Sequence, residues 1–272
     1  MGDCRTVVQD LEDFTAGIFL VDKPRGVTSF KVVRHVRRLL GIKKVGHAGT
    51  LDPFATGLLI ICAGRPATRL IERFMGGTKI YRALLQLGQE TETLDPEGKV
   101  CRTVPVPELS GEEIRTCLED FTGRQQQVPP RYSAAKYKGK PLYHYARKGI
   151  EVVKEPKEIE IFSIDFNGYD AGAGRLDITV VCSRGTYIRV LAADIGKKIG
   201  CGAHLVELRR LGSGMFSVAD SLPGETLLEP EGLQTLLAGM ISVDRATAML
   251  DEADEPVAAS GQESVETGRD NK

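Results

Sequence analysis

Five stretches of the chain have the apolar or alternating pattern of β-strands. Short continuous apolar runs are typical of strands buried on both faces, whereas alternation indicates a strand with one face toward the core. The last two stretches are separated by a glycine-containing turn region at 168–174, so we expect them to pair with each other. The predicted strands cover residues 17–21, 58–63, 81–87, 158–166 and 176–183.

Apolar residues at helical spacing, combined with start and stop signals, predict three helices. Valine and leucine recur at this spacing over 32–40, after a Thr-Ser cap signal and before a glycine. Ser110 and Glu113 have the spacing of a capping box, which predicts a helix that begins there and ends near residue 121. A third helix is expected over 187–199, ended by Gly200.

These elements predict the fold class and the extent of the folded part. Paired strands with interspersed helices favour an α+β protein with a mixed, largely antiparallel central sheet and flanking helices. A chain of 272 residues can bury a sizeable core in one large domain or two smaller ones. From residue 251 onward the sequence is polar and acidic, so we expect one folded domain over 1–250 and a disordered tail over 251–272.

Composition restricts the cellular setting and the class of chemistry. No apolar run approaches the roughly 18 residues of a membrane span, and no charged-then-apolar leader begins the chain. The six cysteines are scattered and form no C-x-x-C pair, which disfavours a structural metal site and fits a reducing compartment. We therefore predict a cytoplasmic protein without a metal ion or a membrane. We also expect it to act as a monomer without an obligate protein partner.

The net charge of −1 conceals two basic zones. Segment 251–272 carries seven acidic and two basic residues, which leaves 34 basic and 30 acidic residues in 1–250. Within that part, residues 23–51 hold eight basic residues and no acidic one, and residues 131–157 hold eight basic and two acidic ones. Zones of this kind bind nucleic-acid backbones, although an isolated lysine-rich stretch is more often a solvated face.

Tyrosines distinguish the second basic zone from an ordinary solvated face. Tyr132, Tyr137, Tyr143 and Tyr145 are interspersed among its lysines and arginines, and stacking with cationic contact is typical of RNA binding. We predict that 131–157 is an RNA-binding arm that closes on its ligand. Its expected contact residues are Arg131, Lys136, Lys138 and Lys140.

The segment Gly46-His47-Ala48-Gly49-Thr50-Leu51-Asp52-Pro53 follows the first basic zone and contains one carboxylate. Two glycines and a proline indicate an irregular loop, a setting in which functional residues are common. The surrounding positive charge is expected to keep Asp52 ionised at neutral pH. From this window alone, a turn in which Asp52 bonds its own backbone is an equal alternative.

The same segment, continued by Ala55-Thr56-Gly57-Leu58-Leu59, resembles the catalytic signature of the TruB family of tRNA pseudouridine synthases. Other segments are similar to further motifs of that family in the order it requires, from about residue 16 to about residue 250. They are IFLVDKPRG at 18–26, KIYR at 79–82, SRGTYIR at 183–189, CGAH at 201–204 and LRRL at 208–211. A resemblance of this extent is far more specific than one short motif.

The resemblance implies a pseudouridine synthase fold, with the active-site cleft across a central sheet, and an activity that needs no cofactor. Uridine in the tRNA T-loop would be flipped out and isomerised at position 55, with Asp52 as the catalytic group. Whether Asp52 attacks the ribose or removes a ribose proton stays open. Arg189 would hold Asp52, and Tyr81 and Leu208 would enclose the uracil. His47 would fill the space left by the flipped base, and Lys23 and Tyr187 would line the pocket.

The resemblance also leaves alternatives of other classes. Many relatives continue into a PUA-type RNA-binding domain, which we do not find in this sequence, so the tRNA T-arm is expected to supply the main contacts. A guide-RNA-dependent subunit is disfavoured because those relatives carry that domain together with basic extensions. A protein that only binds or folds RNA is disfavoured by the presence of Asp52, Tyr81 and Arg189, although a tRNA-folding role alongside catalysis stays open.

Overall fold

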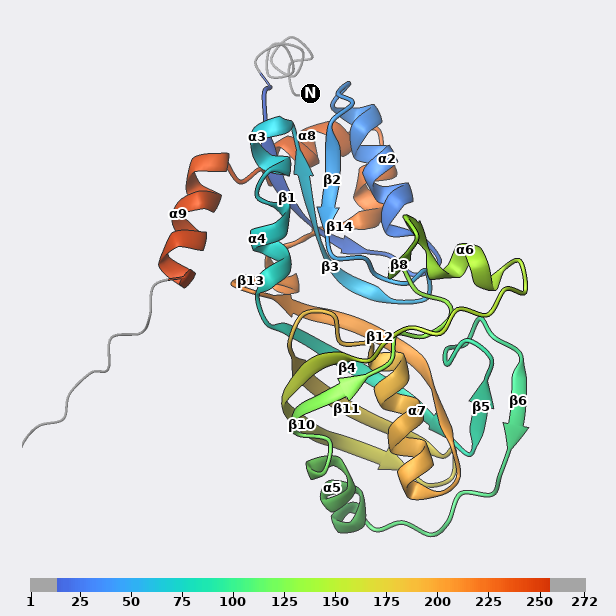
Figure 1. Cartoon of the computed structure of the whole chain (residues 1–272). Coiled ribbons are helices and arrows are strands. Elements are labelled where there is room, and N and C mark those ends of the chain that lie inside the picture. Colours follow the sequence, from blue (N-terminus) through green and yellow to red (C-terminus); the bar gives the residue numbers. More distant parts are fainter. Residues whose placement is uncertain (1–13, 255–272) are drawn as a thin grey trace, which may run out of the picture.

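The computed structural model describes residues 14–254, and its centre is a ten-stranded sheet. The strands of this sheet are β1 (Gly17–Lys23), β2 (Val45–Ala48), β3 (Thr56–Ala63), β4 (Lys79–Leu87), β7 (Gly123–Gln127), β10 (Lys157–Asp170), β11 (Arg175–Cys182), β12 (Ala203–Ser213), β13 (Phe216–Ser217) and β14 (Leu222–Pro223). Their order is β14-β1-β3-β12-β4-β11-β10-β7, with β13 paired to β12 and β2 to β3 (Figure 1). Two small ladders join β5 (Gln89–Thr91) to β6 (Val100–Thr103) and β8 (Lys136–Tyr137) to β9 (Lys140–Pro141).

Helices flank the sheet. They are α2 (Ser29–Leu39), α3 (Arg65–Thr68), α4 (Ile71–Gly76), α5 (Gly111–Glu119), α6 (Leu142–Ala146), α7 (Ile188–Ile199), α8 (Gly232–Ala238) and α9 (Val243–Asp254), with 3₁₀ turns η1 (Val218–Asp220) and η2 (Gly224–Leu228). The capping box predicted at Ser110 and Glu113 is present at the start of α5. Gly200 ends α7 in the left-handed conformation, at φ 98°. Within residues 14–254 every helix is too short or too polar to serve as a membrane span.

Strand pairing confirms the predicted mixed, largely antiparallel sheet. Strands β10 and β11 form the expected hairpin, in which Asp170 pairs with Arg175. Parallel pairing among the described residues is confined to β1 with β14 and β3 with β12. The sequence did not predict β12, although this strand lies between β3 and β4 and therefore joins the two halves of the sheet.

The β1–β3 half of the sheet is covered on both faces. Phe19 and Val21 of β1 pack with α2 and α8 on one face. The alternating residues Ile18 and Leu20 pack with α3, α4 and α9 on the other. This alternation follows from the two-residue period of a strand. On the other half, α5 and α7 cover one face of β4, β10 and β11 (Figure 1).

The two halves meet where β3 and β12 approach each other. Thr56 pairs with Arg209 and Gly57 with Arg210, in parallel. Gly57 has φ 101°, and a Cβ atom there would lie 2.3 Å from the Arg210 carbonyl oxygen. Glycine is therefore required for this approach, which brings the loop before β3 against the residues of β12.

Part of the segment predicted as a disordered tail belongs to α9. This helix runs to Asp254, and Arg73 of α4 forms ion pairs with Asp251 at 2.8 Å and with Asp254 at 2.6 Å. Leu250 of the same helix is buried. Residues 255–272, the rest of that predicted tail, lie outside the described part of the chain.

Candidate active site

The loop that carries Asp52 connects β2 to β3 and is fixed by several hydrogen bonds. The Ser29 hydroxyl at the start of α2 accepts from Leu51 N at 2.9 Å and donates to Leu51 O at 3.1 Å. The amide of Gly26 donates to the Pro53 carbonyl at 2.8 Å. Leu51 and Phe54 are buried on either side of Asp52. The loop is therefore anchored in the core, while the Asp52 side chain stays 33% exposed.

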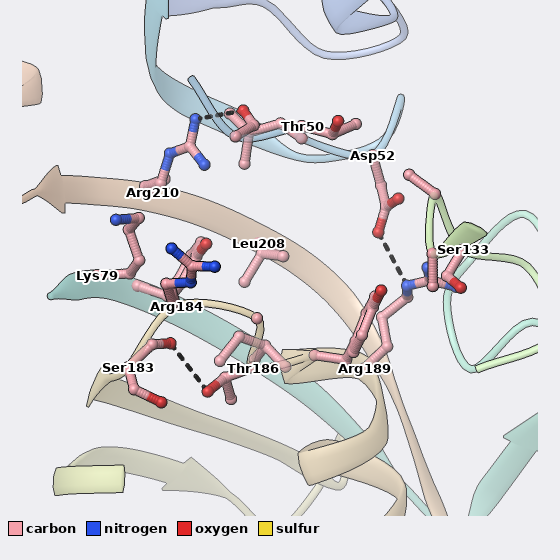
Figure 2. A pocket seen from close by; sticks show the side chains of 18 of the residues that line it. Thr50, Asp52, Lys79, Ser133, Ser183, Arg184, Thr186, Arg189, Leu208 and Arg210 are labelled. Carbon is pink, nitrogen blue, oxygen red and sulfur yellow. Dashed lines mark hydrogen bonds and ion pairs between the residues drawn. The ribbon is translucent and has the colours of Figure 1, made fainter. Parts of the chain in front are cut away.

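Arg189 binds this carboxylate from the first turn of α7. Its Nε lies 2.8 Å from Asp52 Oδ2, and its side chain is only 4% exposed (Figure 2). The Nη atoms are also engaged, since Nη1 donates to the Thr93 carbonyl at 2.9 Å and Nη2 to the Tyr132 carbonyl at 2.8 Å. Bonds in several directions fix the plane of the guanidinium, so Arg189 holds the Asp52 carboxylate in one orientation.

Asp95 is a second carboxylate on the same arginine, and the sequence analysis missed it. Its Oδ2 lies 3.2 Å from Arg189 Nη1, and the residue is 3% exposed. The turn that carries it, between β5 and β6, is closed by a bond from Glu97 N to Asp95 Oδ1 at 3.0 Å. One signal was available, because the tetrapeptide Thr-Leu-Asp-Pro occurs at both 50–53 and 93–96.

A cavity of about 310 Å³ opens beside Asp52. Tyr81 of β4 and Leu208 of β12 line it, as do Tyr187 and Arg189 at the start of α7. The structure thus brings together five of the residues that the sequence analysis named, from four segments far apart in the chain. Both Tyr81 and Leu208 are less than a tenth exposed, which gives the cavity an apolar centre.

Charge is unevenly distributed around the cavity. Its lining includes five basic side chains, namely Lys79, Lys157, Arg184, Arg189 and Arg210, and one carboxylate, Asp52. Desolvation raises the pKa of Asp52 above its ordinary value, while the charge and hydrogen bond of Arg189 oppose that rise. From the sequence, positive charge was expected to dominate at Asp52, but burial acts in the opposite direction and raises the pKa of this carboxyl. Burial likewise raises the pKa of Tyr81, which therefore stays a neutral phenol.

Lys23 lies elsewhere than the sequence analysis expected. It is fully buried and is not among the cavity residues. Its ammonium donates to the carbonyls of Pro24 at 2.9 Å, Val27 at 2.6 Å and Pro53 at 3.3 Å. Desolvation lowers its pKa to about 8. The prediction of an RNA contact is corrected here, because Lys23 instead ties the β1–α2 connection to the loop of Asp52.

His47 also lies outside the cavity, on β2. The residue is half-buried, and its Nδ1 is a buried atom without a hydrogen-bond partner among the described residues. Desolvation lowers the pKa of His47, followed by the charge of Arg210, so the neutral imidazole is favoured. Whether His47 enters RNA stays a prediction.

The predicted RNA-binding arm touches the cavity at both of its ends, and its last residue, Lys157, is one of the lining residues. Ser133, Ala134 and Ala135 line the cavity, directly before the β8–β9 hairpin. The hairpin exposes Lys136, Lys138 and Lys140. Tyr145 of α6 packs edge-on against Tyr137, with ring centroids 5.6 Å apart.

Arg131 is exposed at the start of the arm, and its Nη1 lies 4.0 Å from Glu151 Oε1. The arm is therefore a small folded unit with basic side chains on its surface. Within residues 14–254, no group of three or more His, Cys, Asp or Glu side chains has an arrangement suited to a metal ion.

Comparison with known proteins agrees with this geometry. Residues 37–188 match the family model "TruB family pseudouridylate synthase (N terminal domain)", and residues 189–242 match "tRNA pseudouridylate synthase B C-terminal domain". The chain is 55% identical to a tRNA pseudouridine synthase B of Desulfotalea psychrophila, over 88% of this chain and 98% of that one. It is 43% identical to the protein of that name from Geobacter sulfurreducens, over 93% and 81% of the two chains.

Among solved structures, a chain of a Cbf5-Nop10-Gar1 complex has a similar fold, with a TM-score of 0.64. The sequence identity is 24%, and the match covers 88% of this chain and 63% of that one. At this identity the likeness concerns the fold.

Proposed function

This chain belongs to the TruB family of pseudouridylate synthases, and we propose that it isomerises uridine 55 in the tRNA T-loop with Asp52 as the catalytic group. Membership makes it an isomerase that converts uridine in tRNA to pseudouridine. The observation that carries the residue assignment is the 2.8 Å ion pair between Asp52 and Arg189 at the edge of the cavity.

The reaction defines what the cavity must supply. The N1–C1′ bond of uridine breaks and a C5–C1′ bond forms, so no atom is gained or lost overall. Attack on the ribose by Asp52 and removal of a ribose proton by Asp52 both need the ionised carboxylate. Arg189 favours that form and aims it, because it donates to Asp52 while its other nitrogens are bound elsewhere.

The cavity suits one extruded nucleotide. Its volume of about 310 Å³ is at the lower end of the range of roughly 300–1,000 Å³ for small-ligand sites. Enzymes that act on a base remove it from the stack and hold it between apolar or aromatic side chains. Tyr81 and Leu208 provide such surfaces beside Asp52, and Tyr81 is the residue we assign to stack on the uracil.

We assign recognition of the T-arm to the exposed lysines of the arm and to the basic zone before Asp52. RNA loops are recognised by shape and by bases that leave the stack, with phosphate contacts adding affinity. His47 would then occupy the space of the flipped base. We further propose that the protein acts in the cytoplasm as a monomer, in accordance with its bacterial relatives that modify tRNA.

The test is incubation of the purified protein with an unmodified tRNA transcript, followed by mapping of pseudouridine. We expect one modified position, 55, and no modification when that uridine is replaced by cytidine. Asp52→Asn should abolish the product and keep RNA affinity within a few-fold of the parent. Asp120→Asn, in a surface ion pair with Lys198, is the matched control and should retain activity. An active Asp52→Asn variant would refute the assignment.

A further inference from the structure

The cavity has a cationic end opposite Asp52, which the function described above does not use. Lys79 and Tyr81 lie on the same face of β4, two residues apart, and Arg210 of β12 is the register partner of Tyr81. In Figure 2, Lys79, Arg184 and Arg210 lie on one side of Leu208, and Asp52 with Arg189 lies on the other. A group that spans the cavity therefore meets a carboxylate at one end and cations at the other.

Two of these cations are buried without a carboxylate partner. Arg210 is 1% exposed and Lys79 is 6% exposed, and neither forms an ion pair within residues 14–254. Arg210 donates from Nε to the Leu58 carbonyl at 2.6 Å and from Nη2 to the Gly49 carbonyl at 3.1 Å. Backbone carbonyls compensate a buried charge only in part. The cavity therefore carries positive charge that an anionic ligand would neutralise.

Lys79 has a donor left for such a ligand. Its Nζ donates to the carbonyls of Met75, at 3.2 Å, and Gly77. An ammonium has three N–H groups, so one has no acceptor among the described residues of the protein. Since Lys79 lines the cavity, a ligand there can reach its ammonium.

A purely structural role explains these contacts less well. Neutral donors could satisfy the same carbonyl groups without the cost of burying charge. That cost is considerable for Lys79, because desolvation, with smaller contributions from Arg210 and Arg184, lowers its pKa to about 8. A buried cation beside a substrate cavity is an arrangement that stabilises charge developing during a reaction.

We propose that Lys79 is a further catalytic residue, whose free N–H donates to a carbonyl oxygen of the flipped uracil and stabilises the uracil anion. This inference depends on the proposed function, which places the ribose at Asp52 and the ring on Tyr81. The carbonyl edge of the ring then faces Lys79 and Arg210. When the N1–C1′ bond breaks, its electron pair stays with the uracil, and the negative charge is shared with the carbonyl oxygens. The C5–C1′ bond then forms, C5 loses its proton, and N1 takes up a proton.

Among Lys79 and the titratable groups around it, Lys79 is the group that changes its charge near pH 8. Arg210 faces it from β12, Arg184 from the loop after β11, and Cys182 from its register position on β11. Burial raises the pKa of the Cys182 thiol to about 11, and burial also raises the pKa of Tyr81, which lies on β4 with Lys79. Both groups are therefore neutral at pH 8, where Lys79 loses its charge.

The test is the pH profile of kcat/KM for pseudouridine formation in a T-arm stem-loop, which reports groups of the free enzyme. The parent should lose activity as the pH rises through about 8, the pKa of Lys79. Lys79→Arg keeps its charge at all these pH values, so it should retain measurable activity and lack this loss. Lys79→Met should be slower by about 100-fold or more, as for other groups that stabilise transition-state charge, with RNA affinity within a few-fold of the parent.

Two controls separate the alternatives. Lys157→Met removes a lysine from the exposed rim of the cavity and should retain the loss near pH 8. Lys23→Arg tests the other buried lysine, because the pKa of Lys23 is also about 8. This variant should still lose activity near pH 8. Thermal unfolding checks that each variant is folded. If Lys79→Met does not fold, the profile of Lys79→Arg decides.

A Lys79→Met variant with the rate of the parent, or a Lys79→Arg variant that still loses activity near pH 8, overturns the inference. A parent enzyme that forms no pseudouridine contradicts the proposed function instead. The two failures are therefore distinguishable.

Discussion

Asp52 and Asp95 bind the same guanidinium, from two loops that both have the sequence Thr-Leu-Asp-Pro. Arg189 meets Asp52 through Nε at 2.8 Å and Asp95 through Nη1 at 3.2 Å. Asp52 is partly open to the cavity, whereas Asp95 is buried. The buried carboxylate therefore offsets the charge of Arg189 and fixes its position, and the arginine in turn orients the carboxylate that faces the cavity.

Replacement of Arg189 tests this arrangement. We expect Arg189→Lys to lower kcat/KM by at least about 100-fold, because a lysine cannot present the fork of donors that reaches both carboxylates. Arg189→Ala should be slower still and should also be less stable, since it leaves Asp95 as an unpaired buried charge, at a cost of about 3–5 kcal/mol. Kinetics and thermal unfolding measure the two effects. Arg82→Ala, which breaks an exposed ion pair with Asp177, is the control, and a fully active Arg189→Ala would refute the role.

Asp95→Asn should change the pH profile as well as the rate. Asp52 acts in its ionised form, so activity falls as the pH decreases through the pKa of Asp52. The negative charge of Asp95 raises that pKa, and its removal should therefore move the acid limb of kcat/KM to lower pH. We also expect a slower reaction, because Arg189 loses one of its acceptors.

A merely structural role for Asp95 would lower stability without moving the acid limb. Asp177→Asn is the matched control, since Asp177 pairs with Arg82 at the surface. The measurement is the pH dependence of kcat/KM for the three proteins. An acid limb that stays in place, or moves to higher pH, contradicts the prediction.

The sequence was sufficient for elements that local rules determine. The capping box at Ser110, the stop at Gly200 and the hairpin of β10 with β11 each depend on residues close in the chain, and the structure contains all three. The strand β12 was missed, because its residues include charged side chains such as Arg209 and Arg210 that read as surface positions. Arg210 is nevertheless buried, because strands that are distant in the sequence lie beside it.

The same limit applies to the site. Asp52 and Arg189 were identified by motif, but the partnership of Asp95 with Arg189 requires two loops to meet in space. Lys23 was misassigned for a related reason. In the sequence a lysine beside a proline reads as an accessible residue, whereas the fold buries Lys23 and brings to it the Pro53 carbonyl of a loop 30 residues further along the chain.

Lys23→Met should therefore affect the reaction and not the phosphate contacts. Its loss removes the side-chain donor to the Val27 carbonyl and leaves the Pro53 carbonyl with the Gly26 amide alone, and Pro53 directly follows Asp52. We expect a slower reaction, with an unchanged dependence of RNA affinity on salt concentration. Lys31→Met removes an exposed lysine from the same basic zone and serves as the control for charge. A shallower salt dependence for Lys23→Met would indicate that Lys23 contacts RNA after all.

Neutralising the exposed lysines of the arm should weaken RNA binding and its dependence on salt, while the rate of the reaction changes little. Lys136, Lys138 and Lys140 lie on the β8–β9 hairpin, next to residues that line the cavity. Each lysine that neutralises a phosphate contributes up to about one unit to the log–log dependence of affinity on salt. The triple change to glutamine should therefore weaken binding of a T-arm stem-loop and lower that slope by up to about three units. The rate at saturating enzyme should change little, because none of the three lysines lines the cavity. The control replaces Lys197, Lys198 and Arg175, which removes the same amount of charge. The two lysines lie in the last turn of α7, whereas Arg189 lies in its first turn. This control should leave the slope unchanged. Equal slopes for the arm variant and the parent would show that this segment is a solvated face.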